Sequence, residues 1–346
     1  MKLRPGLSSA RLAVDGTSYD PVMTGAARRT HCLLPRLASR GWQPILFVNR
    51  GAETLFKDLP GVEIVILDVP AHPGPLRSAL ARPAMAAHGR RLGATVFMTE
   101  TPPAPVDLPF ALMIHDLRAW DRPESLSLGR KWWTKRVIPK AAAKAAAILA
   151  PSEFTAAAVR RRFPHSRVVL SPNGCDHFPV AMESPAREDF LLAVGPWSRR
   201  KNLRWLLQAW SGLPGPPPLV LVGRVSDQLP PGVEVRSASD TELGELYRRA
   251  AATLCPSTYE GFGLPLAEAM AQGCPVLASD LPPHREVGGE AARYFQAGSE
   301  QDFRRQWQAM QSHPPSANEL LAQASRFPWR RCAEIVDGVL REIRVS

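Results

Sequence analysis

The sequence predicts an α/β protein of two domains, and two observations predict it. Short apolar runs bounded by glycine or proline alternate along the chain with segments of helical character, the pattern of a largely parallel sheet covered by helices. The length of 346 residues suits two domains of ordinary size, each able to bury its own core. Apolar residues make up 45% and charged residues 22%, a balance typical of a folded globular protein.

The apolar runs set the expected order of elements. In the first half, strands are predicted over 11–16, 44–48, 62–67, 94–98, 110–114, 148–150 and 168–170, with helices over 26–40, 77–92 and 153–163. In the second half, strands are predicted over 190–194, 218–222, 233–236, 250–255 and 275–278, with helices over 241–250, 265–272, 303–327 and 331–343. The run over 110–114 is apolar throughout, as expected of a strand buried in a parallel sheet.

One stretch, residues 255–287, carries most of the chemistry that the sequence offers. An apolar run ends at Cys255, a glycine loop follows at 260–263, and a helix is expected to begin near Pro265, whose fixed φ suits a first turn. Strand, glycine loop, helix and strand form the βαβ arrangement that aims unpaired amides and a positive helix end at an anion.

Two glutamates, Glu260 in the loop and Glu268 in the helix, flank this anion site. A carboxylate repels a phosphate, whereas sugar hydroxyls donate hydrogen bonds to charged acceptors. Taken singly, Glu260 is explained as a solvated loop charge and Glu268 as an acidic residue favoured by the helix dipole. The two together, around Gly-Phe-Gly-Leu-Pro, favour the hydroxyl-binding interpretation.

The segment also resembles a family signature. Glu260 and Glu268 within EGFGLPLAEAM, followed by GCPV at 273–276 and PPHREV at 282–287, are similar to the motif of family-four retaining glycosyltransferases with the GT-B fold. The resemblance implies two Rossmann-like domains that face each other across a cleft. It further implies a nucleotide-diphospho-sugar in the C-terminal domain and an acceptor in the N-terminal domain.

The resemblance implies domain limits and a donor site. The expected domains are 1–178 and 179–329, with a C-terminal helix at about 330–346 that packs back on the first domain. Glu260 would contact sugar hydroxyls and Glu268 the ribose, and the amides around Gly263 and Leu264 would face the sugar and the diphosphate. The predicted donor-binding residues are Glu268, Gly263, Leu264, Phe262, Gly195 and Gly223.

Cations follow the first strand of the C-terminal domain. Arg200 and Lys201 lie in the turn after Gly195, and a diphosphate leaving group needs positive charge there because charge builds on it as the glycosidic bond breaks. The resemblance assigns the phosphate role to these two residues and counts them with the catalytic set. Many relatives also have an arginine directly after the glycine, where this chain has Pro196.

Three residues of the N-terminal half are predicted site residues. His115 follows the strand 110–114 at the carboxyl edge, where ligands of open α/β sheets bind. A lone histidine is usually structural, but a family-four histidine at this place lies near the donor sugar. Asp116 is expected to orient the loop or His115. Gly25 matches the acceptor-side glycine loop of relatives, although Ala26 stands where a second glycine is often found and an ordinary turn explains Gly25 as well.

The net charge of +11 is unevenly placed. Residues 1–178 contain 25 basic and 13 acidic residues, and residues 179–346 contain 18 and 19. A basic N-terminal half favours an anionic partner, such as a phosphorylated lipid carrier or the inner membrane leaflet, and the chain has no nucleic-acid motif. A biased base composition of the gene is the alternative explanation for the excess of basic residues. Residues 129–147 combine cations with Trp132 and Trp133, which suits a membrane interface or an ordinary surface helix with one tryptophan packed inward.

Composition also bears on compartment and cofactors. The N-terminal sequence MKLRPGLSSARLAV interrupts any apolar run with proline and arginine, so a cytoplasmic protein, peripheral on the inner face of the membrane, is expected. The five cysteines lack the spacing of a metal knuckle and are expected to be free. No acidic cluster suits Mg²⁺ or Mn²⁺, so we expect neither a metal nor another cofactor.

The resulting hypothesis is a retaining hexosyltransferase that moves mannose or glucose from a nucleotide sugar to a glycan or a polyprenyl-phosphate-linked acceptor. GDP-mannose is preferred over UDP-glucose as the donor because the Arg-Lys-Asn loop resembles that of mannosyltransferases in polysaccharide assembly. Catalysis would rest on positioning and on stabilising the leaving group. The alternative is a GT-B scaffold that binds a nucleotide sugar or a lipid phosphate without turnover.

Overall fold

The computed structural model describes residues 10–101, 107–179 and 186–345. The chain divides into two compact units, of which unit 1 comprises residues 1–172 and 329–346 and unit 2 comprises residues 173–328. The division falls at 172/173, six residues before the expected limit, because Cys175 and Phe178 pack in the core of unit 2.

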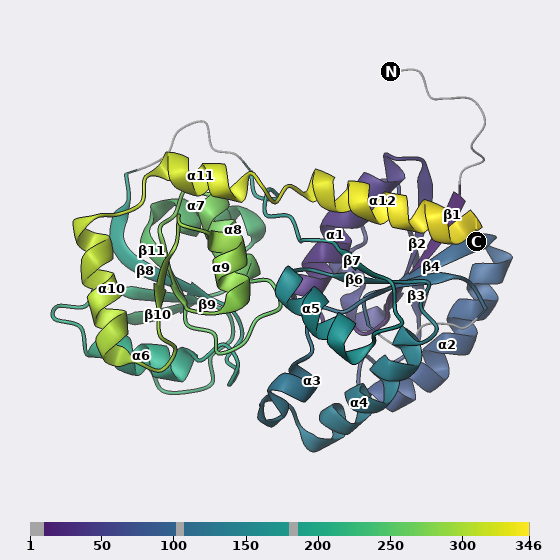
Figure 1. The fold of residues 1–346 in the computed structure, drawn as a ribbon, viewed down its shortest axis with the longest axis horizontal. Coiled ribbons are helices and arrows are strands. Elements are labelled where there is room, and N and C mark those ends of the chain that lie inside the picture. Colours follow the sequence, from purple (N-terminus) through teal and green to yellow (C-terminus); the bar gives the residue numbers. More distant parts are fainter. Residues whose placement is uncertain (1–9, 102–106, 180–185, 346) are drawn as a thin grey trace. The chain divides into compact units, whose positions relative to one another are not determined.

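Unit 1 contains a seven-stranded parallel sheet in the order β3-β2-β1-β4-β5-β6-β7 (Figure 1). Its strands are β1 (Ala10–Gly16), β2 (Trp42–Asn49), β3 (Glu63–Leu67), β4 (Ala94–Thr99), β5 (Phe110–Met113), β6 (Ala147–Ala150) and β7 (Val168–Leu170). Its helices are α1 (Gly25–Ala38), α2 (Gly74–Arg91), α3 (Arg118–Asp121), α4 (Leu128–Ala142), α5 (Glu153–Arg162) and α12 (Trp329–Val345), with 3-10 turns η1 (Arg50–Leu55) and η2 (Pro123–Ser125). The strand order reverses between β1 and β4, which is the switch point at which open α/β sheets bind ligands.

Unit 2 contains a six-stranded parallel sheet in the order β10-β9-β8-β11-β12-β13. Its strands are β8 (Glu188–Val194), β9 (Leu219–Val222), β10 (Val233–Arg236), β11 (Ala250–Cys255), β12 (Val276–Ser279) and β13 (Arg293–Phe295). Its helices are α6 (Leu203–Ser211), α7 (Asp240–Arg249), α8 (Leu264–Ala271), α9 (Pro282–Gly288), α10 (Glu300–Ser312) and α11 (Ala317–Ala324). Here the order reverses between β8 and β11. Both units therefore have the doubly wound, Rossmann-like topology that the sequence predicts.

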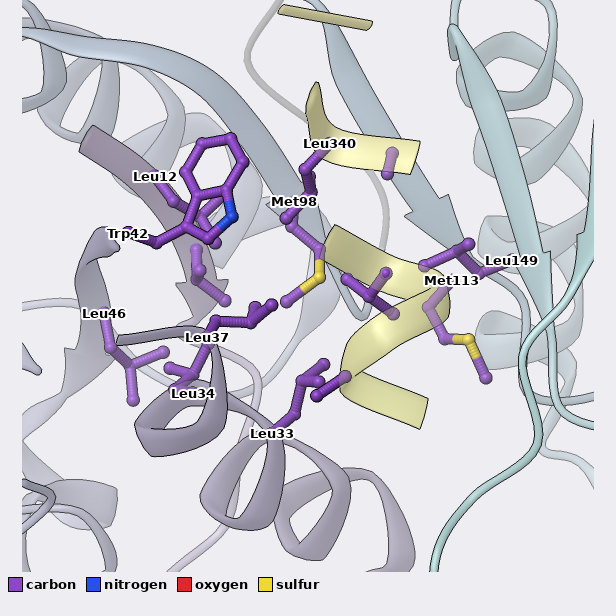
Figure 2. Packing of buried hydrophobic residues seen from close by; sticks show 14 of the residues in the cluster. Leu12, Leu33, Leu34, Leu37, Trp42, Leu46, Met98, Met113, Leu149 and Leu340 are labelled. Atoms are coloured by element: carbon purple, nitrogen blue, oxygen red, sulfur yellow. The ribbon is translucent and has the colours of Figure 1, made fainter. Parts of the chain in front are cut away.

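The C-terminal helix α12 belongs to unit 1 and contacts α1, β4 and β5. Its buried residues recur every three or four positions, the period of a helix face: Trp329, Cys332, Ala333, Val336, Val339, Leu340 and Ile343. Figure 2 shows Leu340 among core side chains of α1 and the sheet, including Leu37 and Met98.

Most expected elements are present, and the main difference has a physical cause. The helix predicted over 303–327 is broken into α10 and α11, because Pro314 and Pro315 cannot donate the backbone hydrogen bonds that a continuous helix needs. Ser316 then starts α11 with a capping box formed with Glu319. Helix α9, which the PPHREV segment forms, and strand β13 had no predicted counterpart. No helix in the described parts of the chain combines the length and apolar character that crossing a membrane requires.

Leu340→Ala is expected to lower the free energy of unfolding of unit 1 by about 2–5 kcal/mol, because it removes a fully buried side chain and leaves a cavity. Urea titration measures the loss, and hydrogen exchange locates it in β4 and β5. Leu128→Ala in α4, where the side chain is 78% exposed, is the matched control and should change stability by less than about 0.5 kcal/mol. Protection lost in unit 2 instead of unit 1 would contradict the placement of α12.

Candidate active site

The candidate site of unit 2 lies at its switch point. Gly195 ends β8 and Gly223 ends β9, and the two backbones approach so closely that a Cβ on Gly223 would lie 2.4 Å from the Gly195 carbonyl oxygen. Both glycines have φ near +140°, a conformation that side chains other than glycine rarely adopt. The turn that carries Arg200 and Lys201 follows Gly195 directly.

A buried carboxylate joins the two predicted loops. Glu260, in the loop after β11, lies with Oε2 2.6 Å from an Arg200 nitrogen and with Oε1 2.9 Å from Lys201 Nζ. The Ser257 hydroxyl donates a further hydrogen bond to Glu260 Oε1, at 2.8 Å. Glu260 is 8% exposed, so two cations and a hydroxyl compensate a carboxylate that has little water around it.

The cations decide the protonation of Glu260. Burial by itself raises the pKa of this carboxyl, but the charges of Arg200 and Lys201 outweigh burial and hold the pKa well below its usual range. His284 completes the surroundings: burial lowers the pKa of its imidazole below the ordinary value of 6.5, against the opposing effect of Glu260. An ionised Glu260, two cations and a neutral His284 leave this end of the sheet with a net positive charge.

The glycine loop is shaped by contact with His284. Gly263 caps α8 with φ 97° and ψ 49°, and a Cβ at this position would lie 2.9 Å from His284 Cδ2. The His284 ring is itself fixed by its Nδ1, which lies 2.8 Å from the Ser279 carbonyl oxygen. Helix α8 begins at Leu264, and the amides of a first helical turn have no partners within the helix. Phe262 points into the core, 5% exposed and edge-on to Phe327, so the structure does not bring its side chain to the site.

The second glutamate of the motif has different neighbours. Glu268 is 5% exposed and accepts a hydrogen bond from the Tyr247 hydroxyl at 3.0 Å. Its other oxygen lies 3.2 Å from His177 Nε2, a residue of the segment that precedes β8. Burial and the Glu268 charge raise the pKa of Tyr247 well above 10, which keeps this hydroxyl a donor. Glu268 thus accepts from a hydroxyl and lies beside a histidine, whereas Glu260 is held by cations.

The site residues predicted in unit 1 fall into two groups. His115 follows β5 at the carboxyl edge, with Nε2 2.9 Å from Oε2 of the buried Glu100, which directly follows β4. Asp116 accepts a hydrogen bond from the Arg118 amide at 3.0 Å, in the turn into α3. Gly25 is the exposed first residue of α1, on a different element from His115 and Asp116. Thr24 caps this helix, because its hydroxyl accepts a hydrogen bond from the Ala27 amide.

The structure therefore gathers Gly195, Gly223, Arg200, Lys201, Glu260, Gly263 and Leu264 around one edge of the unit 2 sheet. Sequence reasoning missed the neighbours of the predicted residues, which are Ser257 beside Glu260, His284 beside Gly263, Tyr247 and His177 beside Glu268, and Glu100 beside His115 in unit 1. His284 stands within the PPHREV motif, and Glu100 stands at the end of a predicted strand, so both had a detectable signal. Across the described ranges, His, Cys, Asp and Glu nowhere form a group of three or more that suits a metal ion.

Comparison with known proteins identifies the family. Residues 23–177 match the family described as Glycosyltransferase Family 4, and residues 188–312 match Glycosyl transferases group 1. O-antigen chain mannosyltransferase B of Escherichia coli is 30% identical over 257 residues, which cover 63% of this chain and 66% of that protein. O-antigen chain mannosyltransferase RfbU of Salmonella typhimurium is 26% identical over 176 residues, covering 46% and 49% of the two chains.

Solved structures agree on the fold. Sucrose-phosphate synthase of Thermosynechococcus elongatus superposes with a TM-score of 0.81 at 19% identity, covering 97% of this chain and 99% of that one. The glycosyltransferase WaaG, involved in lipopolysaccharide biosynthesis, superposes with a TM-score of 0.74 at 16% identity, covering 95% and 99%. The chain belongs to glycosyltransferase family 4 and has the GT-B fold of two Rossmann-like domains.

Gly263→Ala tests the contact between the glycine loop and His284. Alanine at positive φ costs about 1–2 kcal/mol by itself, and the Cβ also displaces the His284 ring. Gly298→Ala is the matched control, since Gly298 has φ 84° and no atom within 4 Å of an added Cβ. Urea unfolding should show a larger loss for Gly263→Ala than for Gly298→Ala. Equal losses would show that His284 does not constrain the loop.

Proposed function

We propose that the protein is a retaining hexosyltransferase that binds a nucleotide-diphospho-sugar at the switch point of unit 2. The observation that carries the proposal is the convergence of Arg200, Lys201 and the ionised Glu260 at that edge, in a chain of family 4. Cations suit the diphosphate and a charged acceptor suits sugar hydroxyls, so the three side chains match the two halves of a donor.

The proposed reaction needs charge stabilisation more than it needs a nucleophile. The bond from the anomeric carbon to the diphosphate breaks, and a bond from that carbon to the acceptor oxygen forms on the same face. The acceptor proton passes to an oxygen of the departing phosphate. Arg200, Lys201 and the amides at the start of α8 would stabilise the charge that develops there, in place of a divalent metal ion.

The proposed sugar is mannose carried on GDP, with UDP-glucose as the alternative. Support comes from the relatives, since two of them are named as mannosyltransferases of O-antigen chains. The related fold of Anabaena HepE, solved with UDP and glucose at 16% identity and a TM-score of 0.76, keeps the alternative open. The proposed acceptor is a glycan or a polyprenyl-phosphate-linked glycan, in the synthesis of a cell-surface polysaccharide or glycolipid by a cytoplasmic enzyme.

Lys201→Ala and Glu260→Ala are each expected to lower kcat by about 10²–10³-fold, because each removes a charge aimed at the donor. A melting-temperature screen of UDP, GDP, ADP and their sugars selects the donor first, since a ligand at 100 times its Kd stabilises by about 2.7 kcal/mol. Product formation is then measured with that donor. Arg204→Ala is the matched control, because this neighbouring cation is 73% exposed and pairs with Asp227 instead. Normal turnover in Lys201→Ala would remove this residue from the mechanism.

The alternative is a scaffold that binds a nucleotide sugar or lipid phosphate without turnover. Pro196, in place of an arginine, and the single glycine of the loop at Gly25 favour it. Stabilisation by one nucleotide sugar with neither transfer nor hydrolysis would support the scaffold, and turnover of any donor would eliminate it.

We also propose that unit 1 docks on an anionic membrane through α2 and α4. These helices contact each other and expose four large apolar side chains: Leu76, Leu80, Leu128 and Trp132. Arg136 stacks on the exposed Trp132, and Arg130, Lys135 and Lys140 are exposed on the same helix. Trp133 packs inward against Gly74, so one tryptophan anchors the helix and the other is available to lipid.

The double substitution Leu128→Ala with Trp132→Ala is expected to weaken binding to phosphatidylglycerol vesicles about tenfold, since it removes most of the exposed apolar area of α4. Vesicle sedimentation measures the partition coefficient, with phosphatidylcholine vesicles as the neutral comparison. Leu321→Ala, on the exposed surface of α11, is the control and should bind like the unaltered protein. Equal partition of all three proteins, or equal binding to neutral vesicles, would overturn the membrane proposal.

A further inference from the structure

The switch point of unit 1 holds a buried carboxylate that has no role in the function proposed above. Glu100 directly follows β4 and has a fully buried side chain, with Oε2 2.9 Å from His115 Nε2. The His115 side chain is 27% exposed although its Nε2 is buried, so the accessible side of the ring is the one that carries Nδ1. The His115 ring therefore turns Nε2 toward Glu100, within 2.9 Å of the carboxylate but without the alignment of a hydrogen bond.

Glu100 is held in place from the opposite side. Arg29 of α1 lies with Nε 3.6 Å from Glu100 Oε1, and both side chains are fully buried. The same guanidinium donates to the Ser171 carbonyl oxygen at 3.1 Å and to the Ser171 hydroxyl at 2.7 Å. Ser171 Oγ in turn lies 3.8 Å from Cys332 Sγ of α12. Glu100 is therefore paired electrostatically with an arginine that itself donates hydrogen bonds to Ser171.

Unit 2 repeats this arrangement at the same places in its topology. In each unit an arginine comes from the connection after the first strand, a glutamate follows the fourth strand, and a histidine follows the fifth. The two sets are Arg29, Glu100 and His115 in unit 1, and Arg200, Glu260 and His284 in unit 2. In unit 2 the glutamate meets its arginine at 2.6 Å and acts electrostatically on its histidine.

We propose that Glu100 is a positioning residue that holds His115 with a proton on Nε2 and a lone pair on Nδ1. A carboxylate beside one ring nitrogen stabilises the proton on that nitrogen and leaves the other as an acceptor. Arg29 already compensates the charge of Glu100, so the pair does not require a positive imidazole. Nδ1 then accepts a hydrogen bond from a substrate hydroxyl. This role for the hydroxyl rests on the proposed transferase function, whereas the tautomer does not.

The experiment has a spectroscopic arm and a kinetic arm. Nitrogen-15 correlation spectra of the histidine rings, with the His115 signals assigned by their loss in His115→Asn, should show protonated Nε2 and unprotonated Nδ1. Glu100→Gln should shift His115 toward the other tautomer and lower kcat about 10²-fold, with the donor KM changed less than threefold, since small errors of placement cost rate of this order. The double variant Arg29→Met with Glu100→Gln removes both buried charges together. If Glu100→Gln alone does not fold, the tautomer and kcat are measured in the double variant instead.

Ser171→Ala is the matched control because it removes a hydrogen bond of Arg29 without touching His115. It should preserve the tautomer and kcat. A His115 ring protonated on Nδ1 in the unaltered protein would overturn the proposal, and so would equal loss of kcat in Ser171→Ala and the Glu100 variants. If no donor is turned over, the proposed function fails, and the spectra alone still decide whether Glu100 sets the tautomer.

Discussion

The contact of Glu260 with Arg200 and Lys201 is the interaction on which the candidate donor site depends. The two cations lie in the turn after β8 and the carboxylate in the loop after β11, about 60 residues later. They meet because the sheet order places β8 beside β11, so that both connections leave the same edge in opposite directions. Neither partner is stable alone at this depth, since a buried charge without compensation costs several kcal/mol. The contact between the carboxylate and the two cations therefore depends on the order of the strands in the sheet.

The same physical requirement explains why unit 1 resembles unit 2 at its own switch point. A doubly wound sheet opens where its strand order reverses, and polar groups that line the opening are partly cut off from water. Each unit meets this cost with an arginine and a glutamate from connections on either side of the reversal. In unit 1 the histidine after the fifth strand lies beside a carboxylate whose charge an arginine already compensates. The fold thus places an arginine and a glutamate at the switch point of each unit, and in unit 2 a second cation, Lys201, joins the pair.

The sequence predicts the sheets well because their strands are apolar runs punctuated by glycine and proline, and the family motif locates Glu260 and Gly263. It does not predict which residues support these groups. Arg29, Glu100 and His115 lie far apart in the chain, and nothing short of the strand order brings α1, β4 and β5 together. Phe262 illustrates the opposite case: a motif residue expected at the donor packs into the core, because the loop must bury one side chain to hold its glycines. The local sequence pattern therefore predicts the helices and strands, whereas the surroundings of each side chain depend on tertiary contacts that the pattern does not show.

The two motif glutamates show how environment divides one residue type between two tasks. Glu260 faces two cations that keep its pKa low, so it stays an ionised acceptor throughout the ordinary pH range. Glu268 instead accepts a hydrogen bond from the Tyr247 hydroxyl and lies beside His177, so among the described residues no arginine or lysine holds it. A ligand hydroxyl that donates to Glu260 competes with the ion pairs of Glu260 with Arg200 and Lys201. This hydrogen bond is most favourable when a phosphate of the same ligand pairs with the two cations. In the proposed donor site, sugar and diphosphate binding would therefore be coupled, and a ligand that carries both groups would be favoured over either alone.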